Sequence, residues 1–419
     1  MRKIKQVLGI ILTIIIVFMT RITPGMAATQ TTKFNAKATL MVDAQTGQIL
    51  QQQNANQKLP IASLSKLLTV LVIQDEIKHH QLSWQTKIKI TPAVGEVANN
   101  PEFSNAGLTV GQSYSVKELV TAALIKSADE ATLALAGATG DSTATFNQKL
   151  QKKAKQLGVT DATIVNAVGL QNGDLPKSLQ VKGVKQNAEN MMTASDVARI
   201  ASVLVNDEPE LAQIASQSTF TLTGKSGTLP TTNKLLMDAT YQVAGVKYTG
   251  LKTGTSGAAG YCLASAATYQ GRKLITVVLH TNGQSDNRFT VTQAMYKWLV
   301  NQKMQPQKLV LTEDTQSVKV TGGLPTEVNV TAPQLVVWGK QAVSKDAPKM
   351  MIKLTKSLAR GELLRAPVGA NQVIGTVYAQ ENGVATLDTK GLKASLETSA
   401  PVRQANFFQI LWHQISGDN

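Results

Sequence analysis

The sequence predicts an α/β (α+β) domain with a sheet and a helical cluster, followed by a small all-β domain. Strand-like stretches lie at 38–53 and 246–281 with helical periodicities between them, so one sheet is expected to use both ends of the first domain. After the polar stretch 301–308, apolar and polar residues alternate between Gly and Pro. A chain of 419 residues is long enough for two such domains.

The first domain is predicted element by element. Residues 38–53 read as two strands around a turn at 45–47, and 246–281 as three strands with a turn at 270–271. Helices are expected at 63–79, 116–138, 143–157, 193–205 and 287–301, the fourth beginning with the capping residue Thr193. This gives a first domain at 28–301 and a β domain at 308–398, which shows no catalytic cluster and is interpreted as a spacer or binding module.

The first 27 residues have the pattern of an export signal. Arg2, Lys3 and Lys5 precede an apolar run, and small residues suited to cleavage follow at 27–28. An uncleaved anchor is the alternative, although the run is short for a full membrane span. Either interpretation places the remaining chain outside the cytoplasm.

The chain is basic and carries few metal-binding side chains. Removing the signal's four positive charges from the formal +15 leaves +11 on the remaining chain. This excess suits binding to an anionic surface such as lipid headgroups or wall polymers. The alternative is a protein surface that is generally basic and soluble, without a specific anionic partner. Scattered basic residues outside the cytoplasm argue against a nucleic-acid partner. The single Cys262 allows no internal disulfide and is expected in the core, and the four histidines lack metal spacing, so no metal or cofactor is expected.

The C-terminal segment 402–416 is predicted to form an amphipathic helix. Phe407, Leu411 and Ile415 recur every four residues, with Phe408 and Trp412 beside them. Such a helix suits the membrane surface and is too short to cross it. The alternative is a terminal helix docked on its own protein.

A serine and a lysine three residues apart begin the helix predicted at 63–79. Ser63 and Lys66 would share one helix face, whose other positions are Ala62, Val70 and Ile73. One interpretation is a lysine that extends its amine from a buried helix to solvent. The other is that the apolar setting favours the neutral amine, which takes the proton of Ser63 and makes it a nucleophile. Helix N-terminal N–H groups would then face an oxyanion.

Two further motifs follow Ser63-x-x-Lys66. They are Ser127-Ala128-Asp129 and Lys252-Thr253-Gly254, and S-x-x-K, S-x-N and K-T-G together are the signature of penicillin-binding proteins and class A β-lactamases. With stretches such as VDAQTGQIL, MTASDVARIA and GLKTGTSGAAGYCL, the chain resembles the low-molecular-mass penicillin-binding proteins, specifically the serine-type D-alanyl-D-alanine carboxypeptidases of peptidase family S11. The resemblance covers nearly everything after the signal and implies a β-lactamase/transpeptidase-like fold with an antiparallel sheet.

The resemblance also implies roles for individual residues. Ser63 would attack the carbonyl between the terminal D-alanines of a peptidoglycan stem peptide, Lys66 would be its base, and Ser127 would relay a proton to the leaving amine. The N–H groups of Ser63 and Thr255 would form the oxyanion hole. The other implied roles belong to the predicted strand that carries the K-T-G motif. Lys252 and Thr253 would hold the terminal carboxylate of the substrate, and the charge of Lys252 would disfavour protonation of Lys66. Gly254 would let the strand approach the substrate backbone closely.

The resemblance implies β-lactams as acylating inhibitors and a location at the outer face of the cytoplasmic membrane or in the wall. No E-x-x-L-N string for a deacylating water lies between the second and third motifs, which argues against a β-lactamase. A second string, Lys225-Ser226-Gly227, is rejected as the third motif because it precedes the N-x-L-L stretch. A transpeptidase or endopeptidase of the same fold stays open, whereas the lack of G-x-S-x-G disfavours a Ser-His-Asp hydrolase.

Asp129 departs from the family, which usually has Asn at this position. An ionised carboxylate cannot donate a hydrogen bond to substrate, and its charge favours a protonated lysine nearby. A slower enzyme, an altered pH optimum and a catalytically weak penicillin-binding scaffold are the three outcomes left open. The sequence predicts that activity survives and that Asp129→Asn changes kcat or its pH dependence.

Overall fold

The computed structural model describes residues 32–340, 348–409 and 412. The predicted signal at 1–27 lies outside the described residues. Of the helix predicted at 402–416, only 402–409 and 412 are described; 407–409 are helical, whereas Arg403–Gln404 form strand β22 and pair with β14. Within the described residues, no helix is both long and apolar enough to cross a membrane.

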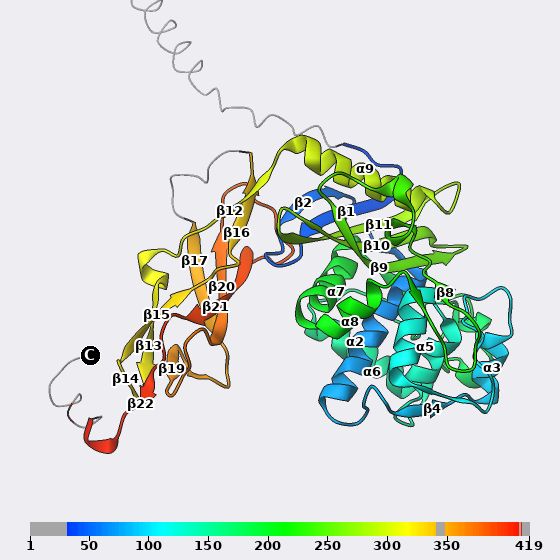
Figure 1. Ribbon diagram of the computed structural model, residues 1–419, viewed down its shortest axis with the longest axis horizontal. Coiled ribbons are helices and arrows are strands. Elements are labelled where there is room, and N and C mark those ends of the chain that lie inside the picture. Colours follow the sequence, from blue (N-terminus) through cyan, green and yellow to red (C-terminus); the bar gives the residue numbers. More distant parts are fainter. Residues whose placement is uncertain (1–31, 341–347, 410–411, 413–419) are drawn as a thin grey trace, which may run out of the picture. The chain divides into compact units, whose positions relative to one another are not determined.

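A five-stranded antiparallel sheet is built from both ends of the first region, as predicted (Figure 1). Its order is β2-β1-β11-β10-β9, so the N-terminal hairpin pairs with the last strand of the C-terminal meander. The strands are β1 (Ala38–Asp43), β2 (Ile49–Gln53), β9 (Lys247–Ser256), β10 (Gly260–Tyr269) and β11 (Arg272–Thr281). Strand β9 therefore lies at one edge of the sheet.

The two faces of this sheet pack against different helices. Side chains alternate along a strand, so on β1 Leu40 and Val42 point into one core and Met41 into the other. Helix α9 (Asn287–Gln302) covers the Met41 face, and α7 (Ala194–Asp207) lies on the opposite face with the larger helical cluster (Figure 1). The sheet is thus buried on both sides, and β9 packs against the helical cluster.

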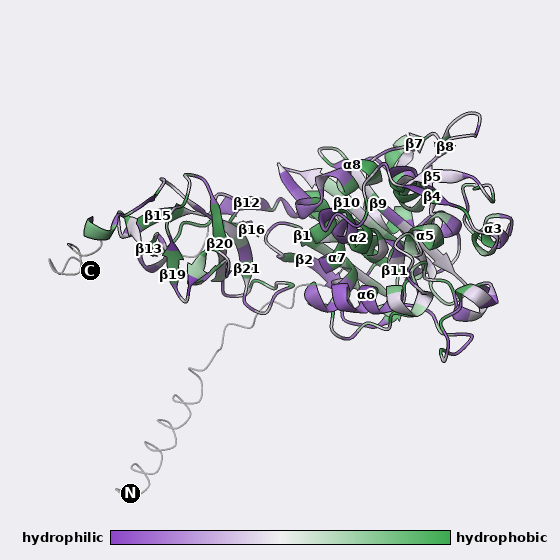
Figure 2. Cartoon of the chain, turned by 90° about the horizontal axis from the view of Figure 1, so that it is seen from below, coloured by the Kyte–Doolittle hydropathy of each residue, from purple (hydrophilic) through white to green (hydrophobic). Residues whose placement is uncertain are grey.

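The helical cluster contains α2 (Lys66–Lys78), α5 (Asp129–Ala136) and α6 (Thr143–Gln156). Helix α2 is buried along most of its length, whereas α6 exposes a lysine-rich face that Figure 2 shows as mainly hydrophilic. The prediction did not include the short helices α3 (Pro92–Ala98) and α8 (Pro209–Ala215), each of which begins at a proline.

One predicted helix is interrupted. The stretch 116–138 forms α4 (Val116–Thr121), a π-helical turn (Ala122–Lys126) and then α5. Between the last two, Ser127 takes a left-handed conformation with φ of 66° that a continuous helix excludes, and the N–H of Ala128 donates to the carbonyl of Ala122. The prediction of one helix was wrong because apolar periodicity continues across the break.

The C-terminal region is β-rich, as the alternating pattern predicted. It has its own apolar core between Leu309 and Val402 and a seven-stranded sheet of order β17-β20-β21-β15-β13-β19-β18. These strands are β13 (Ser317–Thr321), β15 (Glu327–Thr331), β17 (Lys349–Leu354), β18 (Ala359–Arg360), β19 (Leu363–Arg365), β20 (Val373–Gln380) and β21 (Leu392–Thr398). The shorter strands are β12 (Gln305–Lys308), β14 (Gly323–Leu324), β16 (Val336–Gly339) and β22.

Short strand pairs complete the first region. They are β3 (Leu59–Pro60) with β6 (Met191–Met192), β4 (Lys87–Lys89) with β5 (Ser113–Ser115), and β7 (Thr219–Phe220) with β8 (Leu229–Pro230). The β3–β6 pair is the one closest in sequence to Ser63, because a 3₁₀ turn at Ala62–Ser65 follows β3 after a single residue.

Candidate active site

Ser63 and Lys66 meet at the junction between the 3₁₀ turn and α2. The Lys66 Nζ lies 2.6 Å from the Ser63 Oγ, and the Lys66 side chain has no solvent exposure. The turn is fixed by the Ser65 hydroxyl, which donates to the Ala62 carbonyl at 2.6 Å. A lysine nitrogen at hydrogen-bond distance from a buried serine hydroxyl is the arrangement that nucleophilic catalysis by serine needs.

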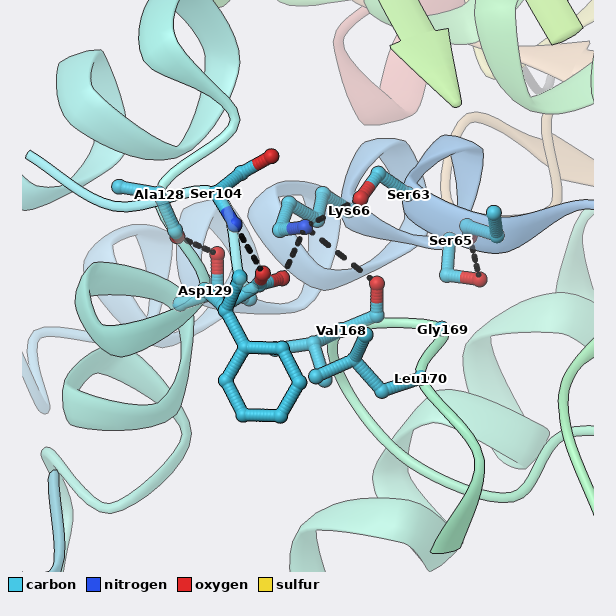
Figure 3. Close-up of polar contacts among 12 residues, drawn as sticks. Ser63, Ser65, Lys66, Ser104, Ala128, Asp129, Val168, Gly169 and Leu170 are labelled. Carbon is cyan, nitrogen blue, oxygen red and sulfur yellow. Dashed lines mark hydrogen bonds and ion pairs between the residues drawn. The ribbon is translucent and has the colours of Figure 1, made fainter. Parts of the chain in front are cut away.

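Lys66 has two further partners, both from distant parts of the chain. Its Nζ lies 2.6 Å from the Asp129 Oδ1 and 3.4 Å from the Val168 carbonyl oxygen (Figure 3). Asp129 is held from both sides by Ser104, whose N–H donates to Oδ2 at 3.1 Å and whose carbonyl accepts from the Asp129 N–H at 2.7 Å. The carboxylate is therefore fixed in contact with Lys66.

The contact between Lys66 and Asp129 corrects the prediction that Lys66 lies in an apolar environment. The helix face itself is apolar as predicted, but the Asp129 carboxylate comes from α5 and approaches from outside that helix. Both side chains are almost fully buried, so solvent screens the pair little. The structure therefore places a carboxylate in direct contact with the amine of Lys66.

Ser127 lies two residues before Asp129, at the helix interruption. It is 4% exposed, and its hydroxyl makes no hydrogen bond within the described part of the chain. The left-handed backbone and the π-helical turn before it set the direction of this residue. Its hydroxyl is free to bond with a ligand.

The edge strand β9 carries the third motif and packs on the Ser63 turn. A Cβ added to Gly254 would lie 2.8 Å from the Ile61 carbonyl oxygen, so only glycine allows this approach. The Thr253 hydroxyl lies 2.7 Å from that of Thr232. This strand places 252–255 directly beside the nucleophile.

Lys252 is fully buried, and its Nζ donates to the Thr253 carbonyl at 2.8 Å. Burial is the main reason that its pKa lies well below the usual lysine value, and repulsion from the charge of Lys66 lowers it further. The charge of Asp129 acts in the opposite direction on the pKa of Lys252.

Arg288 is a site residue that the sequence analysis missed. Its Nη1 donates to the Gly254 carbonyl at 3.0 Å and to the Thr255 Oγ1 at 2.9 Å, and the guanidinium lies over the ring of Tyr261. The residue is 9% exposed. A signal did exist: within the predicted helix 287–301, Arg288 shares a face with Met295, which is fully buried, so a charge there required a partner.

The structure also shows where the residues lie that the sequence analysis rejected as catalytic. Lys225, Ser226 and Gly227 lie in an exposed stretch between β7 and β8. Cys262 is a buried free thiol of β10, and burial raises its pKa to about 11, which makes a thiolate nucleophile unfavourable. In the described residues, no group of three or more His, Cys, Asp or Glu side chains could hold a metal ion.

The comparisons with known proteins identify the family and the fold. A family model described as D-alanyl-D-alanine carboxypeptidase, peptidase S11, matches residues 25–283. The D-alanyl-D-alanine carboxypeptidase DacC of Escherichia coli (strain K12) is 30% identical over 360 residues, covering 83% of this chain and 81% of that protein.

Solved structures show the same fold. The crystal structure of a peptidoglycan synthesis regulatory factor (PBP3) from Streptococcus pneumoniae aligns with a TM-score of 0.72 at 26% identity, over 89% of this chain and 100% of that chain. Penicillin-Binding Protein D2 from Listeria monocytogenes, in its ampicillin-bound form, aligns with a TM-score of 0.52 at 28% identity, over 64% of this chain and 97% of that chain. The predicted penicillin-binding-protein fold is confirmed, and the chain belongs to the D-alanyl-D-alanine carboxypeptidase family, peptidase family S11.

Proposed function

We propose that the protein is a serine D-Ala-D-Ala carboxypeptidase that removes the terminal D-alanine from peptidoglycan stem pentapeptides. The observation that carries the proposal is the 2.6 Å contact between the Lys66 Nζ and the Ser63 Oγ on a buried turn. Strand β9, with Lys252, Thr253 and Gly254, packs directly on this turn. Family membership and the three motifs support the same reaction.

In the acylation step, the Ser63 Oγ attacks the carbonyl carbon of the penultimate D-alanine and gives its proton to the neutral amine of Lys66. The N–H groups of Ser63 and Thr255 stabilise the oxyanion. The C–N bond then breaks, and D-alanine leaves after its nitrogen receives a proton through Ser127. Water hydrolyses the resulting ester and restores Ser63.

Substrate binding depends on cationic groups at β9. Lys252 and the Thr253 hydroxyl are proposed to hold the terminal carboxylate of the substrate. Arg288 donates to the Thr255 hydroxyl and the Gly254 carbonyl, so we assign it a positioning role for the oxyanion N–H of Thr255. Asp129 contacts Lys66 directly, so we assign it an influence on the base.

β-Lactams are proposed to acylate Ser63 and to be released slowly. The ampicillin-bound form of the Listeria relative supports this proposal. The protein is proposed to be exported and to act at the outer face of the cytoplasmic membrane or in the cell wall. Exposed Phe407, Phe408 and Trp412, each more than 70% accessible, support a membrane-surface contact at the C-terminus.

A catalytically weak penicillin-binding scaffold is the second candidate. The observation that favours it is the 2.6 Å pair between Lys66 and Asp129, because an ammonium group cannot accept the Ser63 proton. A scaffold would still present the same fold and bind penicillin. The two candidates differ in turnover.

The test incubates the purified protein with a D-Ala-D-Ala pentapeptide and measures free D-alanine. We expect release by the wild type and none by Ser63→Ala. The matched control is Ser226→Ala, in the exposed Lys225-Ser226-Gly227 string, which should release D-alanine at the wild-type rate. Penicillin labelling without D-alanine release would establish the scaffold instead, and rapid penicillin hydrolysis would indicate a β-lactamase.

A further inference from the structure

Glu189 lies next to the substrate strand and has no role in the reaction as described. The Ser256 hydroxyl, which follows Thr255 on β9, donates to the Glu189 Oε2 at 3.0 Å and accepts from the Ala259 N–H at 2.9 Å. Glu189 is thereby tied to the end of the strand that carries Lys252 and Thr253.

The position of Glu189 is set by its neighbour in the chain. The Asn190 carbonyl accepts from the Ile61 N–H at 3.1 Å, and the Asn190 Oδ1 accepts from the N–H groups of Val165 and Asn166. Asn190 is 1% exposed. The same segment therefore touches both the turn before Ser63 and, through Glu189, the end of β9.

Strand geometry places Glu189 on the nucleophile side of β9. Side chains alternate along a strand, so Ser256 shares its face with Gly254. That face meets the Ser63 turn, because a Cβ on Gly254 would contact the Ile61 carbonyl oxygen. The hydrogen bond from Ser256 then fixes the Glu189 carboxylate on this side.

The order of groups along β9 defines which part of a stem peptide reaches Glu189. Lys252 and Thr253 are proposed to hold the terminal carboxylate, and the Thr255 N–H the carbonyl of the penultimate residue. The chain of the substrate thus continues past Thr255 toward Ser256. In this direction, the third residue of the stem, just before the two D-alanines, would lie beside the Ser256–Glu189 pair.

Among the described residues, no cationic side chain pairs with the carboxylate of Glu189. In this described part of the chain, its Oε1 also has no hydrogen-bond partner. The residue is only 7% exposed. Burial raises its pKa, the hydrogen bond from Ser256 partly offsets this, and the negative charge of Asp174 raises the pKa further. A buried carboxylate of this kind is stabilised when a ligand supplies an ammonium group.

We propose that Glu189 is a specificity-determining residue that binds the side-chain ammonium of a diamino acid at the third position of the stem peptide. This inference rests on the proposed function, because it takes the direction of the substrate along β9 from the proposed carboxylate and oxyanion sites. The ligand class is a peptide with a free primary amine one residue before D-Ala-D-Ala. Acylation of that amine removes both its charge and its donor capacity.

The test compares two tripeptides, Nα-acetyl-L-Lys-D-Ala-D-Ala and the same peptide acetylated on Nε as well. We expect wild-type kcat/KM to favour the free amine by about tenfold to hundredfold, as for one charged hydrogen bond. In Glu189→Gln, which keeps an acceptor for Ser256, this ratio should fall toward one. The matched control Glu313→Gln, at an exposed glutamate of the β-rich region, should keep the wild-type ratio.

The rate of penicillin acylation of Glu189→Gln shows whether the Ser63 site is intact, because penicillin has no third stem residue. Two results would overturn the specificity role and leave the carboxypeptidase proposal standing. One is a wild-type kcat/KM ratio between the two tripeptides that is near one. The other is an unchanged ratio in a Glu189→Gln protein that penicillin still acylates. If the wild type cleaves neither tripeptide, the proposed function fails, and the inference fails with it.

Discussion

Replacing Asp129 by Asn is the substitution that most directly probes the base. In the wild type, the Lys66 Nζ lies 2.6 Å from a carboxylate oxygen, and both side chains are buried. Asn has nearly the same shape, so the change removes the charge without leaving a cavity. The Ser104 N–H still needs an acceptor at the Oδ2 position, which the Asn oxygen supplies.

With its oxygen turned to Ser104, the new side chain presents its NH₂ group to Lys66. An ammonium group and an amide NH₂ group are both donors, so this contact disfavours the ammonium form of Lys66. The substitution therefore favours the neutral amine both by removing the opposite charge and by its hydrogen-bond geometry. This is the form that accepts the proton of Ser63.

The size of the effect follows from the distance. Two unit charges at 2.6 Å attract by about 6 kcal/mol at an effective dielectric constant of about 20. Lost hydration offsets several kcal/mol of this for a buried pair. The charge-assisted hydrogen bond that Asp129→Asn removes is worth about 1.5–3 kcal/mol, which corresponds to a change of about tenfold to hundredfold in a rate constant.

The assay is stopped-flow acylation by a chromogenic penicillin from pH 5 to pH 10. We expect Asp129→Asn to acylate about ten times faster or more at neutral pH and to have a different pH profile. Asp141→Asn, which removes a carboxylate from a more exposed lysine pair, is the control and should behave as the wild type. An unchanged rate and profile in Asp129→Asn would refute the reasoning.

Three further predictions concern β9. Gly254→Ala would bring a Cβ within 2.8 Å of the Ile61 carbonyl oxygen. We therefore expect slower acylation and a loss of about 1–3 kcal/mol in the free energy of unfolding, measured by urea denaturation. Unchanged values would show that β9 can move away from the Ser63 turn. Burial and the charge of Lys66 lower the pKa of Lys252, so the cation is lost as pH rises through that lowered value, and KM for the pentapeptide should rise at a lower pH than for an ordinary lysine. Lys252→Arg should lack this rise, and a parallel rise in both proteins would argue against Lys252. Arg288→Gln should lower the acylation rate about tenfold with little change in KM if Arg288 positions Thr255, and a change in KM alone would assign it to binding.

Local patterns predicted most of the fold. Alternation in 38–53 and 246–281 identified the strands, and their position at the two ends of the region predicted a shared sheet, which the β1–β11 pairing confirms. The helix predicted at 116–138 was wrong at Ser127, because periodicity reports which residues are buried and does not detect a single left-handed residue. That break is also where the second motif lies.

The site was predictable where its residues are linked by motif spacing and much less so where they meet through tertiary packing. Ser63 and Lys66 are three residues apart, so their contact follows from helical geometry. Val168, Glu189 and Arg288 reach the site from segments distant in sequence, and no spacing rule connects them to it. Asp129 was expected to affect Lys66, but its direct contact became clear only in the structure.

The central claim is that Ser63 forms the acyl-enzyme. Intact-mass spectrometry of the protein after brief incubation with penicillin tests it most directly, followed by digestion to locate the adduct. We predict an increase equal to the mass of one penicillin, located on the peptide that contains Ser63 and absent from Ser63→Ala. An adduct on another residue, or one that persists in Ser63→Ala, would contradict the account.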